Sequence, residues 1–180
     1  GKSGVTIYPS NSDNLLKITY NDNTIKYIIV TSDTIDNTLI DSDTINTITE
    51  VEYITSGLPT SIVVTTMGDS VFQGCTSLSS IVLPATLTTM GDSVFQGCTS
   101  LSTIVLPTTL TTISSNAFQG CTSLESVTMP TDVTEILIND YAFKGCTAMS
   151  DITLPNKIEK IRTGKDVFAK DESNTIKLIF

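Results

Sequence analysis

The sequence contains no histidine and no tryptophan, and only 16% of its 180 residues are charged. Without histidine the chain lacks the side chain that most often serves as a general base or a metal ligand near neutral pH. No G-x-S-x-G motif, phosphate-binding loop or paired-carboxylate arrangement stands out, and no candidate base accompanies the many hydroxyl groups. The sequence therefore predicts a protein that is not an enzyme and that needs no cofactor.

Basic residues are also scarce, with 10 lysines and arginines against 19 acidic residues and a net charge of −9. A nucleic-acid or anionic-membrane surface requires clustered basic side chains, and here they are thinly spread. No apolar run approaches the roughly 18–20 residues of a membrane-spanning helix. We therefore expect no nucleic-acid partner and no membrane span, and we interpret the acidity as a contribution to solubility.

Serine and threonine fill more than a quarter of the positions, and an internal repeat dominates the chain. Four near-identical segments are Val71–Leu78, Val94–Leu101, Ala117–Leu124 and Ala142–Met149, and a degraded fifth copy begins at Val167. Their cysteines, Cys75, Cys98, Cys121 and Cys146, follow one another at steps of 23, 23 and 25 residues. This period lies within the range of about 20–29 residues that is typical of leucine-rich repeats.

Within each unit the apolar residues predict one coil of a solenoid. Leu101, Ile104 and Leu106 fit the L-x-x-L-x-L pattern, in which alternate residues face inward from a short strand. We therefore expect strands at 78–83, 101–106, 124–129 and 149–154, aligned in register as one parallel sheet.

The rest of the coil is predicted from the residues between two such strands. Pro84 ends the strand, and Leu87 and Met90 point inward from a second extended segment. The run 91–93 is expected to lead into a helical turn with an Asp or Ser cap, which buries Phe95 and closes at Gly97. A lone coil cannot offset its ordering entropy of roughly 23–46 kcal/mol, so the coils must stack.

Residues 1–57 do not carry the repeat and are predicted to form a separate N-terminal β cap. The runs 16–20 and 24–30 flank Asn21-Asp22-Asn23, as in a β-hairpin with a short turn. Residues 34–54 alternate Thr with Ile or Val and predict further β-structure. Solenoids need a cap over the end coil, and the alternative is an independent binding domain. The predicted division is thus a cap at 1–57 and a solenoid at 58–180.

The four cysteines permit a disulfide, metal or free-thiol interpretation. Zinc sites use close cysteine pairs, whereas these lie a full repeat apart, and no histidine is available. Identically oriented side chains in a ladder rarely offer the torsion of a disulfide. We therefore predict four reduced, inward-facing thiols and no metal. The Asp41-Ser42-Asp43 run with Glu52 does not match a calcium loop, because Ile45 stands at a ligand position and Asn46 replaces the required glycine.

The run A/V-F-x-G-C-T-S-L-x-x-I-x-L-P, as in Ala117–Pro130, resembles the BspA-like leucine-rich repeats of surface proteins from bacteria and some parasitic protozoa. The resemblance covers roughly residues 58–168. It implies a right-handed leucine-rich-repeat solenoid of the α/β repeat class, with short parallel strands and short helical turns. It also implies a secreted or surface-anchored protein that adheres to host matrix proteins or to other microbes. The expected partner is therefore a host extracellular or matrix protein, or another cell-surface protein. Thr86 and Thr109 depart from the commoner repeats, which carry an asparagine ladder at that position.

We hypothesise a protein-binding module that uses the outward face of the strand sheet. The candidate residues alternate with the core positions and are Ser80, Val82, Thr103, Val105, Ser126, Thr128, Asp151 and Thr153. Six strands about 4.8 Å apart and about five residues long give a face of roughly 400 Å², whereas a standard interface needs about 800 Å² per partner. We therefore expect weak binding by a monomer. The alternatives are a structural spacer and a module that self-assembles through terminal strands such as 175–180.

Overall fold

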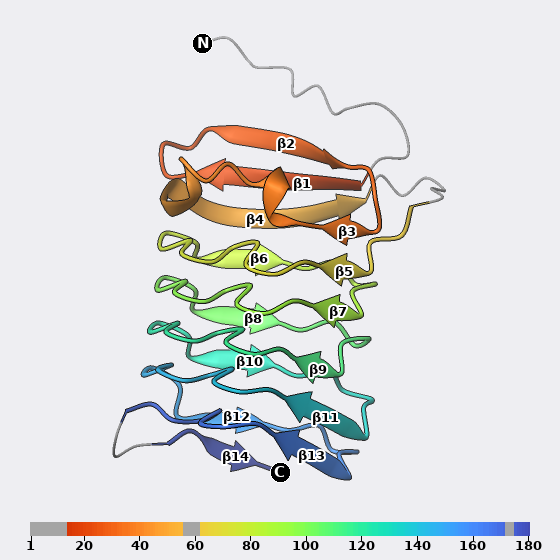
Figure 1. Ribbon diagram of the computed structural model, residues 1–180, viewed down its shortest axis with the longest axis vertical. Helices are drawn as coiled ribbons and strands as arrows, with labels where there is room; N and C mark the ends of the chain where they lie inside the picture. The colour runs from red at the N-terminus through yellow and green to blue at the C-terminus, as the bar shows by residue number, and fades with distance from the viewer. Residues whose placement is uncertain (1–13, 56–61, 172–174) are drawn as a thin grey trace.

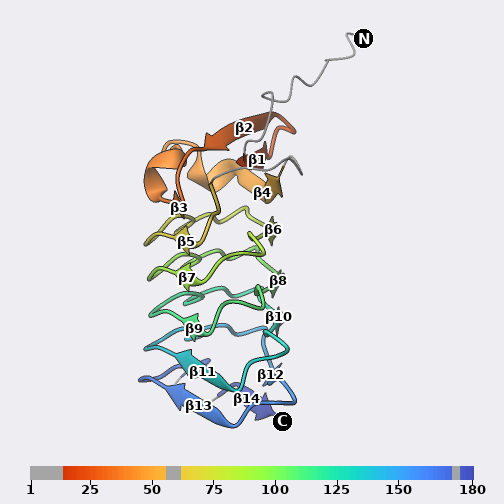
Figure 2. The same ribbon diagram turned by 90° about the vertical axis from the view of Figure 1, so that its right-hand side faces the viewer.

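The computed structural model describes residues 14–55, 62–171 and 175–180, which form a stack of coils along one axis (Figure 1). The coils place short strands on two opposite faces of the stack (Figure 2). Face A is the outward side of β4 (Ile48–Thr55), β6 (Ser80–Val82), β8 (Thr103–Val105), β10 (Ser126–Thr128), β12 (Asp151–Thr153) and β14 (Lys177–Ile179). Face B is the outward side of β3 (Thr34–Ile35), β5 (Thr66–Met67), β7 (Thr89–Met90), β9 (Thr112–Ile113), β11 (Glu135–Ile138) and β13 (Lys160–Thr163). The predicted solenoid of short parallel strands is confirmed.

The strands of face A pair in parallel and in register, but not as the single sheet that the repeat predicts. β4 pairs with β6, β8 with β10, and β12 with β14. No ladder joins β6 to β8 or β10 to β12 in the described part of the chain. The expectation of one continuous sheet is therefore wrong, and the strands are shorter than expected. Face B is divided once, into β3-β5-β7 and β9-β11-β13.

The aromatic core continues through these divisions. Phenylalanine rings stack from coil to coil with centroids 5.3–6.4 Å apart and interplanar angles of 3–11°. The rings belong to Phe72, Phe95, Phe118, Phe143 and Phe168. The divisions of face A do not follow the ring spacing, because the rings are 5.3 Å apart at the unpaired boundary between β10 and β12 and 6.4 Å apart at the paired boundary between β12 and β14.

The N-terminal end carries the predicted hairpin, formed by β1 (Asn14–Tyr20) and β2 (Ile25–Val30). Asp22 accepts hydrogen bonds from the N–H and hydroxyl of Thr24 across the turn. β1 also pairs with β4 antiparallel, and β4 continues in parallel to β6. The hairpin therefore joins the solenoid through β4. Two 3₁₀ helices, η1 (Asn37–Leu39) and η2 (Ile45–Thr47), lie between β3 and β4.

The helical turns that the sequence predicts are tight turns without an α-helix, as the described coils show. Phe95 and Gly97 donate their N–H groups to the next coil, to Ala117 and Gln119, at 2.9 and 2.8 Å. Those groups cannot then donate within their own turn, as an α-helix requires. Ser93 and Gly97 are also both left-handed, with φ of 58° and 73°. We call this third side of the stack, which includes residues 92–100 and their equivalents, the turn edge.

The turn edge is held together by side chains that replace the expected helix cap. The carboxylate of Asp69 accepts from the N–H of Asp92 in the next coil at 2.8 Å, and Asp140 likewise accepts from Lys165 at 2.7 Å. The side-chain amides of Gln73, Gln96 and Gln119 form a ladder with distances of 3.2 Å. The acidic residue thus links two coils instead of capping its own turn.

Candidate functional site

All eight predicted binding residues are exposed on face A, on β6, β8, β10 and β12. They alternate with buried Ile104, Val127 and Ile152 and with half-buried Ile81. Val82 and Val105 are the large apolar members, with exposed fractions of 55% and 66%. The structure thus brings the eight side chains onto one surface, made of small hydroxyl and aliphatic groups with one charge at Asp151.

Face A extends beyond the four strands that the sequence analysis selected. Strand register places Glu50 and Glu52 beside Ser80 and Val82 at one end. At the other end it places Lys177 beside Asp151. Two signals in the sequence indicate these additional residues. Polar and apolar residues alternate in β4, and the run 175–180 is similar to the strand segments. The neutral centre of face A is therefore flanked by acidic residues on one side and a lysine on the other.

Two hollows lie on face A where the hydrogen-bonded ladder is interrupted. One of about 300 Å³ lies between β6 and β8 and is lined by Ile81, Val82, Leu83, Ala85, Val105 and Pro107. We call it the apolar hollow. The second, of about 430 Å³, lies between β10 and β12. We call it the hydroxyl hollow, since Ser126, Thr128 and Thr131 line it together with Met129.

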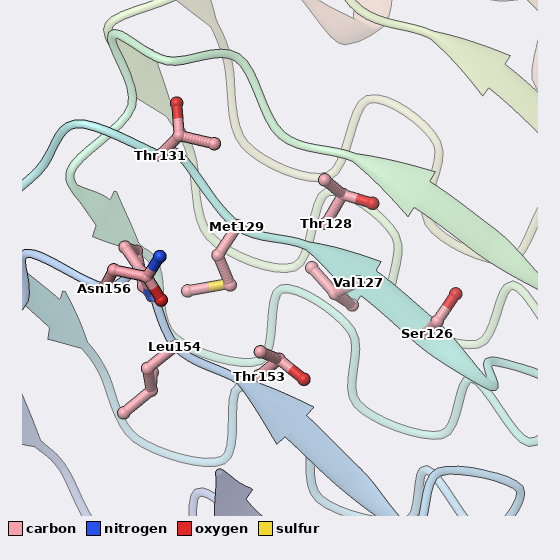
Figure 3. A pocket seen from close by; sticks show the side chains of 9 residues that line it. Ser126, Val127, Thr128, Met129, Thr131, Thr153, Leu154 and Asn156 are labelled. Carbon is pink, nitrogen blue, oxygen red and sulfur yellow. The ribbon is translucent and has the colours of Figure 1, made fainter. Parts of the chain in front are cut away.

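Figure 3 shows the hydroxyl hollow from close by. Met129 lies between the segments that follow β10 and β12, with Leu154 and Asn156 beside it. Met129 and Leu154 are buried, with exposed fractions of 6% and 2%, so they form an apolar floor. Thr131 and Asn156 are exposed and bring polar groups to the rim. Sequence reasoning did not find either hollow, because the repeat pattern treats all coils as equivalent.

Threonine hydroxyls hold neighbouring coils in register behind face A. Thr86 donates to the carbonyl of Val64, and Thr109 donates to that of Leu87 at 2.6 Å. These are the positions at which commoner repeats carry asparagine, and here the hydroxyl donates to the preceding coil. Such bonds favour a rigid binding surface, which reduces the entropy lost on association.

The charges are distributed unevenly along the solenoid. Residues 1–140 hold 3 basic and 14 acidic residues, a net −11, and residues 141–180 hold 7 and 5, a net +2, which together give −9. Several basic groups of the last coils are already engaged. Arg162 and Lys160 contact Glu135 on face B at 3.2 and 3.9 Å. The hydrogen bond with Tyr141 raises the pKa of Lys165.

The cysteines form a buried column and are free thiols. Three of them donate to carbonyl groups of the preceding coil at 3.0–3.1 Å, in the pairs Cys98 to Phe72, Cys121 to Phe95 and Cys146 to Phe118. Burial raises the pKa of the Cys146 thiol to about 12. Because the thiolate is the reactive form, the raised pKa makes Cys146 a poor nucleophile in the folded protein.

Within the described residues no cluster of three or more His, Cys, Asp or Glu side chains could hold a metal ion. Asp41 instead accepts a hydrogen bond from the N–H of Asp43 in a local turn. The described part of the chain also contains no helix long and apolar enough to cross a bilayer.

The stacked coils and their flat outward strands define a repeat module of the leucine-rich class, a scaffold that indicates protein binding. The chain belongs to the BspA type leucine rich repeat family, whose model matches six copies over residues 65–178. The family resemblance noted in the sequence is thus confirmed. No curated protein matches the chain.

Three solved structures are similar to this chain. A leucine-rich repeat protein from Bacteroides ovatus is 27% identical, with a TM-score of 0.45 over 69% of this chain and 35% of that one. A leucine rich cell surface protein from Faecalibacterium prausnitzii is 21% identical, with a TM-score of 0.41 over 94% and 53%. A leucine rich repeat protein from T. pallidum is 25% identical, with a TM-score of 0.44 over 86% and 85%. The chain thus spans about a third of the length of the Bacteroides ovatus protein and about half of the length of the Faecalibacterium prausnitzii protein.

Proposed function

We propose that this chain is a non-catalytic adhesion module of a cell-surface or secreted protein, and that face A binds its partner. The partner is a host extracellular or matrix protein, or another cell-surface protein. The observation that carries the proposal is the exposure of all eight outward side chains on one surface, with Val82 and Val105 more than half exposed. Family membership supports a protein-binding repeat module.

The composition of face A fits recognition of a protein better than recognition of a charged polymer. Its centre offers hydroxyl groups as donors and acceptors around exposed valines, and Asp151 is its one charge. Interfaces commonly combine an apolar centre with a polar rim. Six strands of about five residues would give roughly 400 Å². Because β6, β8, β10, β12 and β14 are three residues long, face A is smaller than half of a standard interface per partner, so the isolated chain is expected to bind in the micromolar range or more weakly.

The experiment is direct binding of the purified chain to immobilised matrix proteins, measured by biolayer interferometry. A face A variant, Thr103→Arg with Ser126→Arg, places two bulky charges at the centre of the surface. A matched face B variant, Thr66→Arg with Thr89→Arg, places the same charges on the opposite side. Saturable binding that the face A variant loses and the face B variant retains supports the proposal. Equal losses in both variants contradict the assignment of face A.

The two alternatives from the sequence give different results in the same assay. A spacer binds none of the matrix proteins and remains a monomer in light scattering. A self-assembling module shows a mass that increases with concentration. Exposed Ile179 and Phe180, with exposed fractions of 45% and 83%, are the apolar groups that such assembly would use.

A further inference from the structure

The turn edge is hydrogen-bonded across every boundary between the coils that contain the stacked phenylalanines. At each boundary three backbone N–H groups donate to carbonyl groups of the next coil at 2.8–3.1 Å. The donors are the phenylalanine and the residues two before and two after it, as in Ser93, Phe95 and Gly97. This ladder is continuous from Ser70 to Ala169, so the turn edge holds neighbouring coils together along its whole length.

Face A lacks such bonds at the two boundaries where its strands are unpaired. At the paired boundaries Leu106 donates its N–H to the carbonyl of Thr128 in β10 at 3.0 Å, and Leu154 donates to β14 at 2.8 Å. Leu83 and Met129 occupy the same place in the repeat, 106 − 83 = 23 and 154 − 129 = 25 residues earlier. Within the described residues neither N–H donates to the next coil, and each residue lines one of the hollows. Backbone groups that are paired elsewhere in the repeat thus adjoin the hollows.

Face B is hydrogen-bonded in the same coils. β5 pairs with β7 in the coils that carry β6 and β8, and β9 pairs with β11 in the coils that carry β10 and β12. Beyond the first opening the hydroxyl of Thr109 also donates to the carbonyl of Leu87, which keeps the two coils in register. Each of these boundaries is therefore held on two sides of the stack and open on the third. The motion left to it is a tilt that changes the spacing of the strands at face A.

We propose that the boundary between β6 and β8 and the boundary between β10 and β12 are joints, at which neighbouring coils tilt and face A opens and closes. Closing the first joint brings the N–H of Leu83 to the carbonyl of Val105. Closing the second brings the N–H of Met129 to the carbonyl of Thr153. The closed form gains these ladder bonds and loses the hollow, whereas the open form leaves the same groups to water. Because a bond within the chain replaces bonds with water at little net free energy, both forms are accessible.

The joints divide face A into three strand pairs, β4-β6, β8-β10 and β12-β14, each held by its own ladder. Val82 and Val105 stand on either side of the first joint, and Thr128 and Thr153 stand on either side of the second. The spacing between these outward side chains changes with the tilt, whereas side chains within one pair keep their spacing. A partner that contacts both sides of a joint therefore binds one form more tightly and shifts the population toward it.

The first measurement is amide hydrogen exchange of the full chain, followed residue by residue by nuclear magnetic resonance. We expect the amides of Leu83 and Met129 to exchange at least about ten-fold faster than their matched controls, because Leu106 and Leu154 are bonded to the next coil. The amide of Phe95 on the turn edge should be protected at least as strongly as the controls. Equal protection of all five amides would show that face A is closed at every boundary and that the joints do not exist.

The second measurement tests the motion itself, with pairs of spin labels at exposed positions. Ser80→Cys with Asp151→Cys crosses both joints on face A. Thr76→Cys with Thr147→Cys is the matched pair on the turn edge, since 151 − 80 = 71 and 147 − 76 = 71. The four native cysteines are buried and should remain unlabelled. We expect the distribution of label distances in electron paramagnetic resonance to be at least about twice as broad on face A as on the turn edge.

Melting temperatures close to that of the parent chain establish that both labelled variants are folded. A broad distribution on face A together with rapid exchange of Leu83 and Met129 supports the joints. Equal widths of the two distributions overturn them even where these amides exchange rapidly, because the open backbone groups would then belong to a rigid stack. Neither measurement involves a partner, so a negative result leaves the proposed function of face A unaffected.

Discussion

The ring of Phe118 lies between those of Phe95 and Phe143, with centroids 5.4 and 5.3 Å away, and is fully buried. Phe118→Ala removes contacts with two coils and leaves a cavity, so it should lower the free energy of unfolding by about 3–5 kcal/mol. Urea denaturation followed by circular dichroism measures the change. Thr89→Ala, at an exposed position of β7, should change the stability by less than about 0.5 kcal/mol. Losses of similar size in both variants would show that the inward and outward assignments are wrong.

Most individual positions could be assigned to the inside or outside from the repeat alone. Leu78, Phe95 and Leu101 are buried as the repeat phase predicts, and all eight outward positions of face A are exposed. Thr112 directly precedes the inward-facing Ile113, a place in the repeat that predicts an outward side chain, yet Thr112 is half-buried. The reason is that β9 pairs with β11, where Leu137 stands opposite Thr112 and covers part of it. Burial at such positions depends on the neighbouring coil, which the single repeat does not describe.

The buried thiols make the stability of the fold dependent on pH in the alkaline range. Burial raises the pKa of Cys146 to about 12 in the folded protein, whereas an unfolded thiol ionises near about 8.5. The folded state thus holds this proton more tightly. The contribution of the protonated Cys146 thiol to the free energy of unfolding is fully present below the pKa of the unfolded chain, and it is lost as the pH rises from about 8.5 through 12.

Alkaline conditions should therefore lower the urea midpoint progressively, because the thiols of Cys98, Cys121 and Cys146 have raised pKa values and each can contribute up to about 1.4 kcal/mol per pH unit in this window. Cys146→Ala removes one such thiol. Its free energy of unfolding should fall less steeply between pH 8 and pH 10.5 than that of the parent chain, whatever its stability at neutral pH. Other groups that titrate in this range are common to both proteins and cancel in the comparison. Parallel slopes would show that Cys146 does not carry the effect.

One hydrogen bond between neighbouring coils is donated by the hydroxyl of Thr109 to the carbonyl of Leu87 at 2.6 Å. Thr109→Val keeps the shape of the side chain and removes the donor, so it should cost about 0.5–1.5 kcal/mol, the usual range for one hydrogen bond. Thr108→Val, at the adjacent exposed position, serves as the control and should be close to neutral. Thermal unfolding of the three proteins distinguishes them. A neutral Thr109→Val would show that the hydroxyl does not help to hold the coils in register.

At the level of strands and turns, the sequence predicts which side chains face inward better than it predicts which strands are hydrogen-bonded to each other. The strand segments begin near the expected residues because inward and outward side chains alternate visibly along them. The interruptions between β6 and β8 and between β10 and β12 are not visible in the repeat, which treats all coils as equivalent, and they do not follow the spacing of the stacked phenylalanines. The hollows follow from those interruptions. The turns differ from the helical turns that the sequence predicts, because the N–H groups of Phe95 and Gly97 donate to carbonyl groups of another coil.

The whole molecule carries the charges of face A toward its two ends, where Lys17 stands in register with Glu52 and Asp151 with Lys177. Glu50 and Glu52 lie at one end, and Lys177 lies at the other. The eight outward residues of the four central strands predict binding that scarcely depends on salt, because Asp151 is the one charge among them. The two additional glutamates introduce a salt-dependent contribution for a partner that reaches β4, because exposed charges are screened at high ionic strength. Raising the salt concentration should therefore weaken such binding modestly, and Glu50→Gln with Glu52→Gln should remove that dependence.

Binding through the centre of face A should depend far more on Val82 and Val105 than on salt. Val82→Lys with Val105→Lys introduces two charges into the apolar hollow and the surface beside it, where both valines are more than half exposed. Neither change reaches the buried core, so the melting temperature should remain close to that of the parent chain. The affinity for a matrix protein that binds the parent chain should fall at least about ten-fold, equivalent to about 1.4 kcal/mol. Calorimetry at two salt concentrations separates this loss from a simple change in net charge, because a loss due to net charge alone would largely disappear in high salt. A double variant that binds as tightly as the parent chain would exclude face A and direct attention to the turn edge or the hairpin.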